Sequence, residues 1–323
     1  MGMLLNRALH YCNDWCNIAE GTNRFNPTVS IIIPAYFPQH LNCVLEHLQR
    51  LGGFFEIIVV DDSGKYLLSP KSIAENVKLI SHHRNLGRSA ARNTGAFYAK
   101  GDILLFLDQD MYLSPLFLTQ MKQYFASNHE SVIVLGLRDT VAYSEIPSVD
   151  NWLEPSRYND WRKSIIVSDM MVDLTATEVG AVDNNCSLGE QISIYDSTDG
   201  LRKLGISPEK TIGFWDIASM VISHSMSISK NDFFAIGGFP EWIEGWGGED
   251  IVLGFLSIAY GLPIVLMDVM SYQELHPPYS GSERTKLLEL RRNIAYYHIW
   301  LKNINNFPIF PYDECLHRAT PLI

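Results

Sequence analysis

The chain has 323 residues, of which 47% are hydrophobic and 19% charged, and it carries a formal net charge of −11. This composition is typical of a globular protein with one large domain or two, and the negative charge argues against a nucleic-acid partner. No run approaches the ~18 apolar residues of a membrane-spanning helix, and five scattered cysteines favour a reducing compartment. We therefore expect a cytoplasmic location. Peripheral docking at the inner face of the membrane, through residues 1–27 or 283–302, stays an open alternative.

Apolar strands and helices alternate through the first half of the chain. Before them, residues 1–27 are expected to form a helical arm that ends at Asn26-Pro27. Strands are expected at 29–33, 56–60, 77–80, 103–107 and 132–137, and helices at 41–51, 70–75 and 88–99. Strands that are apolar throughout predict an α/β fold, with a mostly parallel sheet covered by helices on both faces. Ligands of such a sheet bind beyond the carboxyl ends of its strands.

The second half has a weaker pattern. Residues 138–215 mix aromatic and charged side chains without a clear period. A helix at 250–260, a strand at 263–267 and a long helix at 283–302 are expected after them. The tail beyond Phe307 is expected to be irregular.

Two carboxylates follow the strand expected at 103–107. Asp108 and Asp110 flank Gln109, and residues two apart in an extended chain project to the same side. Carboxylates placed in this way can hold one hard divalent cation, Mn²⁺ or Mg²⁺, and leave ligand positions for diphosphate oxygens. A solvated turn is the alternative, but the position at the end of a parallel strand favours the metal site.

Polar residues follow the two preceding strands as well. Asp61 and Asp62 end the second strand, where they can accept hydrogen bonds from a base or a ribose; a polar turn is the alternative. Segment 84–93 joins a strand to a helix, and arginine forks and helix N-terminal amides suit phosphate or a pyrimidine carbonyl. In the simpler alternative, Arg92 caps the helix or pairs with a carboxylate at the end of the sheet.

Segment 245–250, Gly-Trp-Gly-Gly-Glu-Asp, opens the helix expected at 250–260. Glu249 and Asp250 lie where free amides and the helix dipole favour negative charge, which keeps a carboxylate ionised as a general base requires. Gly247 and Gly248 leave room for a sugar ring, and Trp246 offers it a flat apolar face. An acidic helix start without a catalytic role is the alternative.

His276 follows the strand expected at 263–267, in the stretch Glu-Leu-His-Pro-Pro. An imidazole is a competent third ligand for a divalent transition metal. A lone histidine is often structural, so both roles stay open. The stretch 278–282 after it has the composition of a lid that closes over bound donor.

The motifs taken together resemble the GT-A fold glycosyltransferases, especially those of family 2. The segments that carry the resemblance are 30–36, 59–63, 85–93, 108–110 and 237–250. The last of them also resembles a stretch of the β-1,4-galactosyltransferases, in which the aspartate is the base and the tryptophan contacts sugar. The resemblance implies a nucleotide-sugar donor, UDP-linked in the first instance, and an acceptor hydroxyl on a glycan, a lipid-linked sugar or a protein.

The resemblance also implies roles for single residues. Asp250 is expected to be the base, Glu249 a hydrogen-bond partner of the acceptor, and Trp246 with Gly247 and Gly248 the acceptor wall. Metal ligands are expected to be Asp108, Asp110 and His276, although Gln273-Glu274 precedes the histidine rather than following it. Residues expected to bind the donor are Pro34, Tyr36, Asp61, Asp62, Arg84, Asn85, Arg88, Asp108 and Gln109. A one-step displacement that inverts the anomeric carbon is the expected reaction.

The resemblance gives the expected domain organisation. An N-terminal helical arm covers 1–27, a nucleotide-sugar-binding half 28–137, an acceptor-binding and catalytic half 138–280, and a C-terminal helical extension 281–323. Other enzyme classes fit less well. In the aspartyl-phosphate hydrolases the Asp-x-Asp pair follows the first strand, whereas here it follows the fourth. A dinucleotide-dependent oxidoreductase would have a glycine-rich fingerprint after a strand, and no strand of this sequence is followed by one. A catalytically silent sensor of nucleotide sugars is the alternative from outside the enzymes. All these expectations require that the acidic clusters near 108 and 250 meet in space.

Overall fold

The computed structural model describes residues 9–11, 28–37, 39–53, 55–65, 76–126, 131–153, 160, 221–262, 264–275 and 283–322. The strands are β1 (Leu9–Tyr11), β2 (Val29–Ala35), β3 (Phe55–Asp61), β4 (Val77–His82), β5 (Ile103–Leu107), β6 (Met111–Tyr112), β7 (Ile133–Val141), β8 (Ser225–Ser229), β9 (Ile264–Glu274) and β10 (Ala319–Pro321). The helices are α1 (Leu41–Leu51), α2 (Arg88–Tyr98), α3 (Phe117–Ala126), α7 (Lys230–Ala235), α8 (Glu249–Tyr260), α9 (Glu283–Leu301) and α10 (Tyr312–His317), with short 3-10 turns at Tyr143–Glu145 and Val149–Asn151.

All the strands belong to one sheet, in the order β1-β9-β7-β8-β5-β2-β3-β4-β10, with β6 paired to β9. The central strands β5, β2, β3 and β4 run parallel, as their apolar sequences predict. The α/β class is therefore confirmed. The sheet is more mixed than we expected, because β8 lies antiparallel between β5 and β7, and β10 lies antiparallel on β4.

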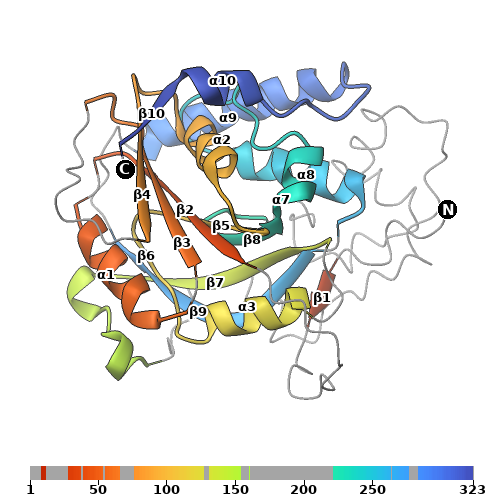
Figure 1. Ribbon diagram of the computed structural model, residues 1–323. Helices are drawn as coiled ribbons and strands as arrows, with labels where there is room; N and C mark the ends of the chain where they lie inside the picture. The colour runs from red at the N-terminus through yellow and green to blue at the C-terminus, as the bar shows by residue number, and fades with distance from the viewer. Residues whose placement is uncertain are drawn as a thin grey trace.

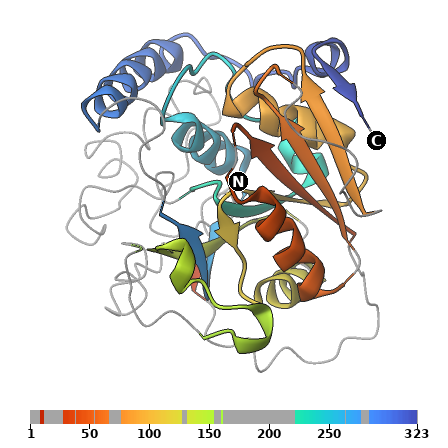
Figure 2. The ribbon, with the colours of Figure 1, turned by 90° about the vertical axis from the view of Figure 1, so that its left-hand side faces the viewer.

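Helices cover both faces of this sheet (Figure 1, Figure 2). Alternate residues of β2 divide between two cores: Ile32 packs with residues of α2, α8 and α9, and Ile31 and Ile33 pack with residues of α1 and α3. Helix α2 lies close to the sheet at Gly95, where an added Cβ would stand 2.3 Å from Ile32 Cγ2. This close contact sets the distance between α2 and the face of the sheet.

Two segments differ from the prediction. Residues 9–11, expected within a helical arm, form β1 and pair in parallel with β9, which is an effect of tertiary pairing that local periodicity does not reveal. The tail expected to be irregular contains α10 and β10, and β10 borders β4 at the edge of the sheet. The rest of the arm, the helix expected at 70–75 and residues 161–215 lie outside the described residues.

Candidate active site

The two acidic clusters meet at one side chain, Arg92 of α2. Its Nη2 lies 2.9 Å from Asp108 Oδ1 at the end of β5, and its Nη1 lies 3.3 Å from Glu249 Oε1 and 3.9 Å from Asp250 Oδ1 at the start of α8. Arg88, one helical turn before Arg92, reaches Glu249 Oε1 at 3.4 Å. The convergence of the clusters is therefore confirmed, and the sequence alternative in which Arg92 pairs with a carboxylate at the end of the sheet is confirmed as well.

Burial strengthens the interaction of Arg92 with the three carboxylates of this cluster. The side chains of Arg92 and Glu249 are 3% and 2% exposed, and those of Asp108 and Asp250 are 28% and 21% exposed. Burial alone would lower the pKa of Arg92, but the three carboxylates outweigh it and raise that pKa. Arg92 is consequently a permanent cation, and the more exposed edges of Asp108 and Asp250 are the parts of the cluster that a ligand can reach.

Asp250 differs from the helix-dipole prediction. Burial and the charge of Glu249 raise the pKa of Asp250 to about 6, against the opposing effect of Arg92. The carboxylate is still ionised at neutral pH, but it binds a proton far more readily than an ordinary aspartate, as a general base should. The desolvation of this carboxylate, together with the charge of Glu249, therefore outweighs the favourable position at the start of α8.

Asp110 lies beside Asp108 and supplies the second carboxylate of the Asp-x-Asp pair. Gln273 Nε2 of β9 donates to both Asp110 oxygens at 3.2 Å, and burial together with the charge of Asp108 raises the pKa of Asp110 to about 7. By contrast, Arg92 and Arg88 outweigh burial and lower the pKa of Asp108. A divalent cation between the two carboxylates would relieve their mutual repulsion, and their hard oxygens suit it.

Among the described side chains, the carboxylate pair has no third metal ligand beside it. Within the described ranges, no group of three or more histidine, cysteine, aspartate or glutamate side chains has the geometry to hold an ion. His276, the expected third ligand, lies outside the described residues. The Asp108–Asp110 pair therefore offers two carboxylate ligands, a number that a divalent cation can use together with ligands from another source.

Asp62 closes the loop in front of α2. Its Oδ1 accepts from the backbone N–H of Leu86 and its Oδ2 from that of Gly87, each at 2.8 Å, and His82 Nδ1 lies 2.7 Å from Oδ1. Gly87, at φ 90°, is the N-cap of α2. Asp62 is thus engaged with its own fold, which favours a role in shaping the donor site over direct contact with donor. Asp61 is also buried, and its Oδ1 accepts from the N–H of Ser63.

Other expected donor residues line the same rim of the sheet. The backbone N–H of Tyr36, after β2, donates to Gln109 Oε1 at 2.8 Å, and the Tyr36 side chain is 48% exposed. Pro34 lies in β2 and is only partly buried. Arg84 and Asn85 are exposed in the loop between β4 and α2, so both are accessible to an anionic ligand.

The expected acceptor wall is held by α9. The backbone N–H of Trp246 donates to Glu289 Oε2 at 3.0 Å, and Asn293 Nδ2 donates to the Gly247 carbonyl at 2.8 Å. Trp246 is 38% exposed, as a stacking surface requires. Gly247 and Gly248 have φ of 81° and 100°, a backbone conformation that favours glycine. The backbone therefore explains why glycine occupies these two positions, besides the room that glycine leaves for a sugar.

Sequence reasoning missed three residues of this site as functional candidates. Arg92 was seen only as a possible partner of a carboxylate, although it organises the cluster. Gln273 and His40 gave no signal, yet Gln273 binds Asp110, and His40 Nδ1 lies 2.6 Å from Glu274 Oε1 beside it. These contacts join residues far apart along the chain, so no local pattern could have revealed them.

Comparisons with known proteins agree with this geometry. Residues 30–169 match the model for glycosyl transferase family 2, and residues 219–267 match a model described as the N-terminal domain of galactosyltransferase. The first match contains Asp108 and the second contains Asp250. The chain is thus similar to glycosyl transferase family 2 over its first matched region and to the galactosyltransferase model over its second, and carboxylates from the two matched regions meet at Arg92.

Individual relatives are distant. The validoxylamine A glucosyltransferase of Streptomyces hygroscopicus subsp. jinggangensis is 24% identical over 259 residues, which are 76% of this chain and 55% of that protein. The inactive polypeptide N-acetylgalactosaminyltransferase-like protein 5 of Mus musculus is 23% identical over 313 residues, 90% of this chain and 64% of that protein. This chain therefore spans about half the length of the first relative.

One solved structure is a mannosyltransferase from Pyrobaculum calidifontis in complex with GDP-Man and Mn²⁺. It aligns with a TM-score of 0.47 and 14% identity over 83% of this chain and 63% of that one. A likeness at this level assigns no role to any residue. Among the described residues, no helix combines the length and the hydrophobicity needed to cross a membrane.

Proposed function

We propose that this chain is a glycosyltransferase that moves a sugar from a nucleotide-sugar donor, in the first instance a UDP-sugar, to an acceptor hydroxyl on a glycan, a lipid-linked sugar or a protein. The observation that carries the proposal is the contact of one buried guanidinium, that of Arg92, with carboxylates from both glycosyltransferase-type regions. That contact brings a strand-end carboxylate pair and a basic carboxylate of α8 into one site.

The donor side of the site consists of Asp108, Asp110 and the loop that carries Arg84 and Arg88. When bound, a divalent cation, Mn²⁺ being the first candidate, neutralises charge on the leaving diphosphate. Asp108 and Asp110 would hold this cation. Arg88 projects from the first turn of α2, is 40% exposed and lies 3.4 Å from Glu249, so it can bind a phosphate oxygen without leaving the cluster.

The acceptor side consists of Asp250 and Trp246. The Asp250 carboxylate takes the proton of the acceptor hydroxyl, and the hydroxyl oxygen forms a bond to the anomeric carbon. The bond from that carbon to the donor phosphate breaks, and its electron pair leaves with the nucleoside diphosphate. Attack from the face opposite the leaving group inverts the anomeric carbon. The burial of Glu249 favours a role in holding Arg92 over direct contact with the acceptor.

Asp250→Asn tests the assignment of the base. Removal of a general base lowers kcat by about 10²–10⁴-fold, whereas donor affinity is expected to stay close to that of the wild type because the donor contacts other residues. Asp313→Asn is the matched control, since Asp313 also lies in the first turn of a helix but is exposed on α10. Undiminished turnover in Asp250→Asn would exclude Asp250 as the base.

A silent nucleotide-sugar sensor is the second candidate. It is favoured by the inactive mouse relative, whose alignment covers 90% of this chain. A thermal-shift screen of nucleotide sugars with and without Mn²⁺ identifies the donor, because a ligand of the native state raises its apparent stability. Transfer assays with that donor then decide between the candidates. Transfer that a chelator abolishes and Mn²⁺ restores supports the enzyme, and tight donor binding without transfer to any of a broad set of acceptors supports the sensor.

A further inference from the structure

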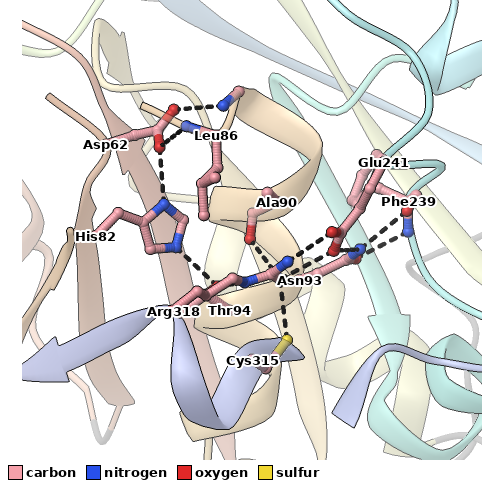
Figure 3. Close-up of polar contacts among 11 residues, drawn as sticks. Asp62, His82, Leu86, Ala90, Asn93, Thr94, Phe239, Glu241, Cys315 and Arg318 are labelled. Atoms are coloured by element: carbon pink, nitrogen blue, oxygen red, sulfur yellow. Dashed lines mark hydrogen bonds and ion pairs between the residues drawn. The ribbon is translucent and has the colours of Figure 1, made fainter. Parts of the chain in front are cut away.

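A second arginine, Arg318, contacts α2, and its side chain is 10% exposed. Arg318 follows α10, close to the end of the chain, and its guanidinium lies against the helix (Figure 3). Nε donates to Thr94 Oγ1 at 2.8 Å, and Nη2 donates to the Ala90 carbonyl at 3.1 Å. Nη1 and Nη2 also donate to the two oxygens of Glu241, at 2.5 and 2.9 Å. Every nitrogen of this guanidinium therefore has an acceptor.

The contact with Thr94 continues through the interior to Asp62. Thr94 Oγ1 lies 2.8 Å from His82 Nε2, and His82 Nδ1 lies 2.7 Å from Asp62 Oδ1. A guanidinium only donates hydrogen bonds, so the Thr94 hydroxyl accepts from Arg318 Nε. A carboxylate only accepts, so His82 Nδ1 donates to Asp62. Arg318 is thus connected to Asp62 by a continuous series of contacts through Thr94 and His82.

The path ends at the loop that begins α2. Asp62 accepts the backbone N–H groups of Leu86 and Gly87, as described above. His82 and Thr94 are fully buried, so water cannot replace a missing partner in this path without a rearrangement. The position of Asp62, and with it the position of the loop carrying Arg84 and Arg88, therefore depends on contacts that start at the C-terminal segment.

A second branch connects the same arginine to the acceptor side. Glu241 Oε1 also accepts from Asn93 Nδ2 at 2.7 Å, and Asn93 exchanges two hydrogen bonds with the backbone of Phe239, each 2.9 Å long. Residues 239–241 lead directly into the loop 245–248 and the start of α8. Arg318 thus fixes α2 with respect to both halves of the candidate site.

We propose that Arg318 is a positioning residue for the donor site, acting through Thr94, His82 and Asp62 on the loop of residues 84–88. The proposal rests on the proposed function, since it takes that loop to bind the donor. Arg318 is then a working part of the site, although it lies beyond both regions that match glycosyltransferase models.

Thr94→Val interrupts the path at its centre while the side chain keeps its branched shape. His82 Nε2 and Arg318 Nε lose their partner, and the loop is no longer held in one position. We expect the KM for the nucleotide-sugar donor to rise by about tenfold, the value for one buried hydrogen bond left unmade. We expect kcat and the KM for acceptor to change by less than about twofold, because Asp250 and Trp246 do not contact this path.

Two further variants make the test specific. Thr94→Ser restores the hydroxyl and is expected to restore the donor KM. Thr320→Val removes a hydroxyl from β10 whose contact is His83 Nε2, at 3.0 Å, outside the path, and is expected to leave the donor KM unchanged. A lower melting temperature in Thr94→Val with an unchanged donor KM would show that the path serves stability alone, and would overturn the proposal.

Hydrogen exchange separates this proposal from the proposed function. The amides of Leu86 and Gly87 are expected to exchange about tenfold faster in Thr94→Val, in the absence of any substrate, and at the wild-type rate in Thr320→Val. If the wild-type chain neither binds nucleotide sugars nor transfers sugar, the proposed function fails. The positioning of the loop by Arg318 is then decided by these two amides, and wild-type exchange in Thr94→Val would overturn it.

Discussion

Two arginines hold α2, and their surroundings differ. Arg318 has an acceptor for each of its three nitrogens. Arg92 faces three carboxylates, yet within the described part of the chain its Nε has no hydrogen-bond partner, and neither do Glu249 Oε2 and Asp250 Oδ1. The guanidinium of Arg318 thus has hydrogen-bond partners for all its nitrogens, whereas the Arg92 cluster contains polar atoms that have none among the described residues.

The difference separates a structural contact from a site prepared for a ligand. Buried polar atoms are nearly always paired, so unpaired atoms gathered at the end of a sheet require an explanation. In the proposed function, an acceptor hydroxyl and a cation with its diphosphate approach the exposed edges of Asp250 and Asp108, next to these unpaired atoms. The Arg318 cluster needs no ligand, which suits a residue that only positions others.

The largest expected effect comes from removal of the guanidinium at Arg92. Arg92→Met leaves three carboxylates without their common cation and should lower the free energy of unfolding at pH 7 by about 3–5 kcal/mol. Arg318→Met leaves a single carboxylate, that of Glu241, which is 27% exposed; the cost should be about 1–3 kcal/mol. Urea denaturation of both variants measures the difference. An equal or larger loss in Arg318→Met would contradict the contrast between the clusters.

The pH dependence of transfer probes the Arg92 cluster directly. Asp250 must be ionised to accept a proton, and its pKa is about 6. As pH falls below that value the carboxylate becomes protonated, so kcat/KM should fall about tenfold per pH unit. A profile of kcat/KM between about pH 4.5 and 8 measures this limb. Activity that persists unchanged to about pH 5 would show that Asp250 is not the base or that its surroundings are more solvated.

The smallest expected effect belongs to Glu249→Gln. The charge of Glu249 raises the pKa of Asp250, so its removal lowers that pKa and moves the acidic limb to lower pH. The value of kcat/KM at about pH 5, divided by its plateau value at neutral pH, should be about two- to fivefold higher in Glu249→Gln than in the wild type. Glu314→Gln, an exposed change in the first turn of α10, is the control. A limb that does not move would mean that the charge of Glu249 does not contribute to the raised pKa of Asp250.

Much of the central fold could be predicted from particular segments. Continuous apolar runs placed β2, β3, β4, β5 and β7, and helical spacing with terminal glycines placed α1 and α8. Strand β8 was not predicted, although Ser225–Ser229 alternates hydroxyl and apolar side chains with the period of a strand, because the alternation extends over five residues only. Strand β1 and the C-terminal β10 are three residues each, and short strands are defined by their neighbours rather than by their own sequence.

The candidate site divides in the same way. The sequence by itself determined that Asp108 and Asp110 follow the end of a strand and that Glu249 and Asp250 lie at the start of a helix. Strand ends and helix starts are local features that a sequence pattern reveals. Tertiary structure alone decided that one guanidinium, that of Arg92, joins them, that Asp250 has a raised pKa, and that Arg318 is connected to the loop of residues 84–88 through three buried side chains. The physical reason is that periodicity reports the environment of a segment, whereas desolvation and buried hydrogen bonds depend on which distant segments pack against it.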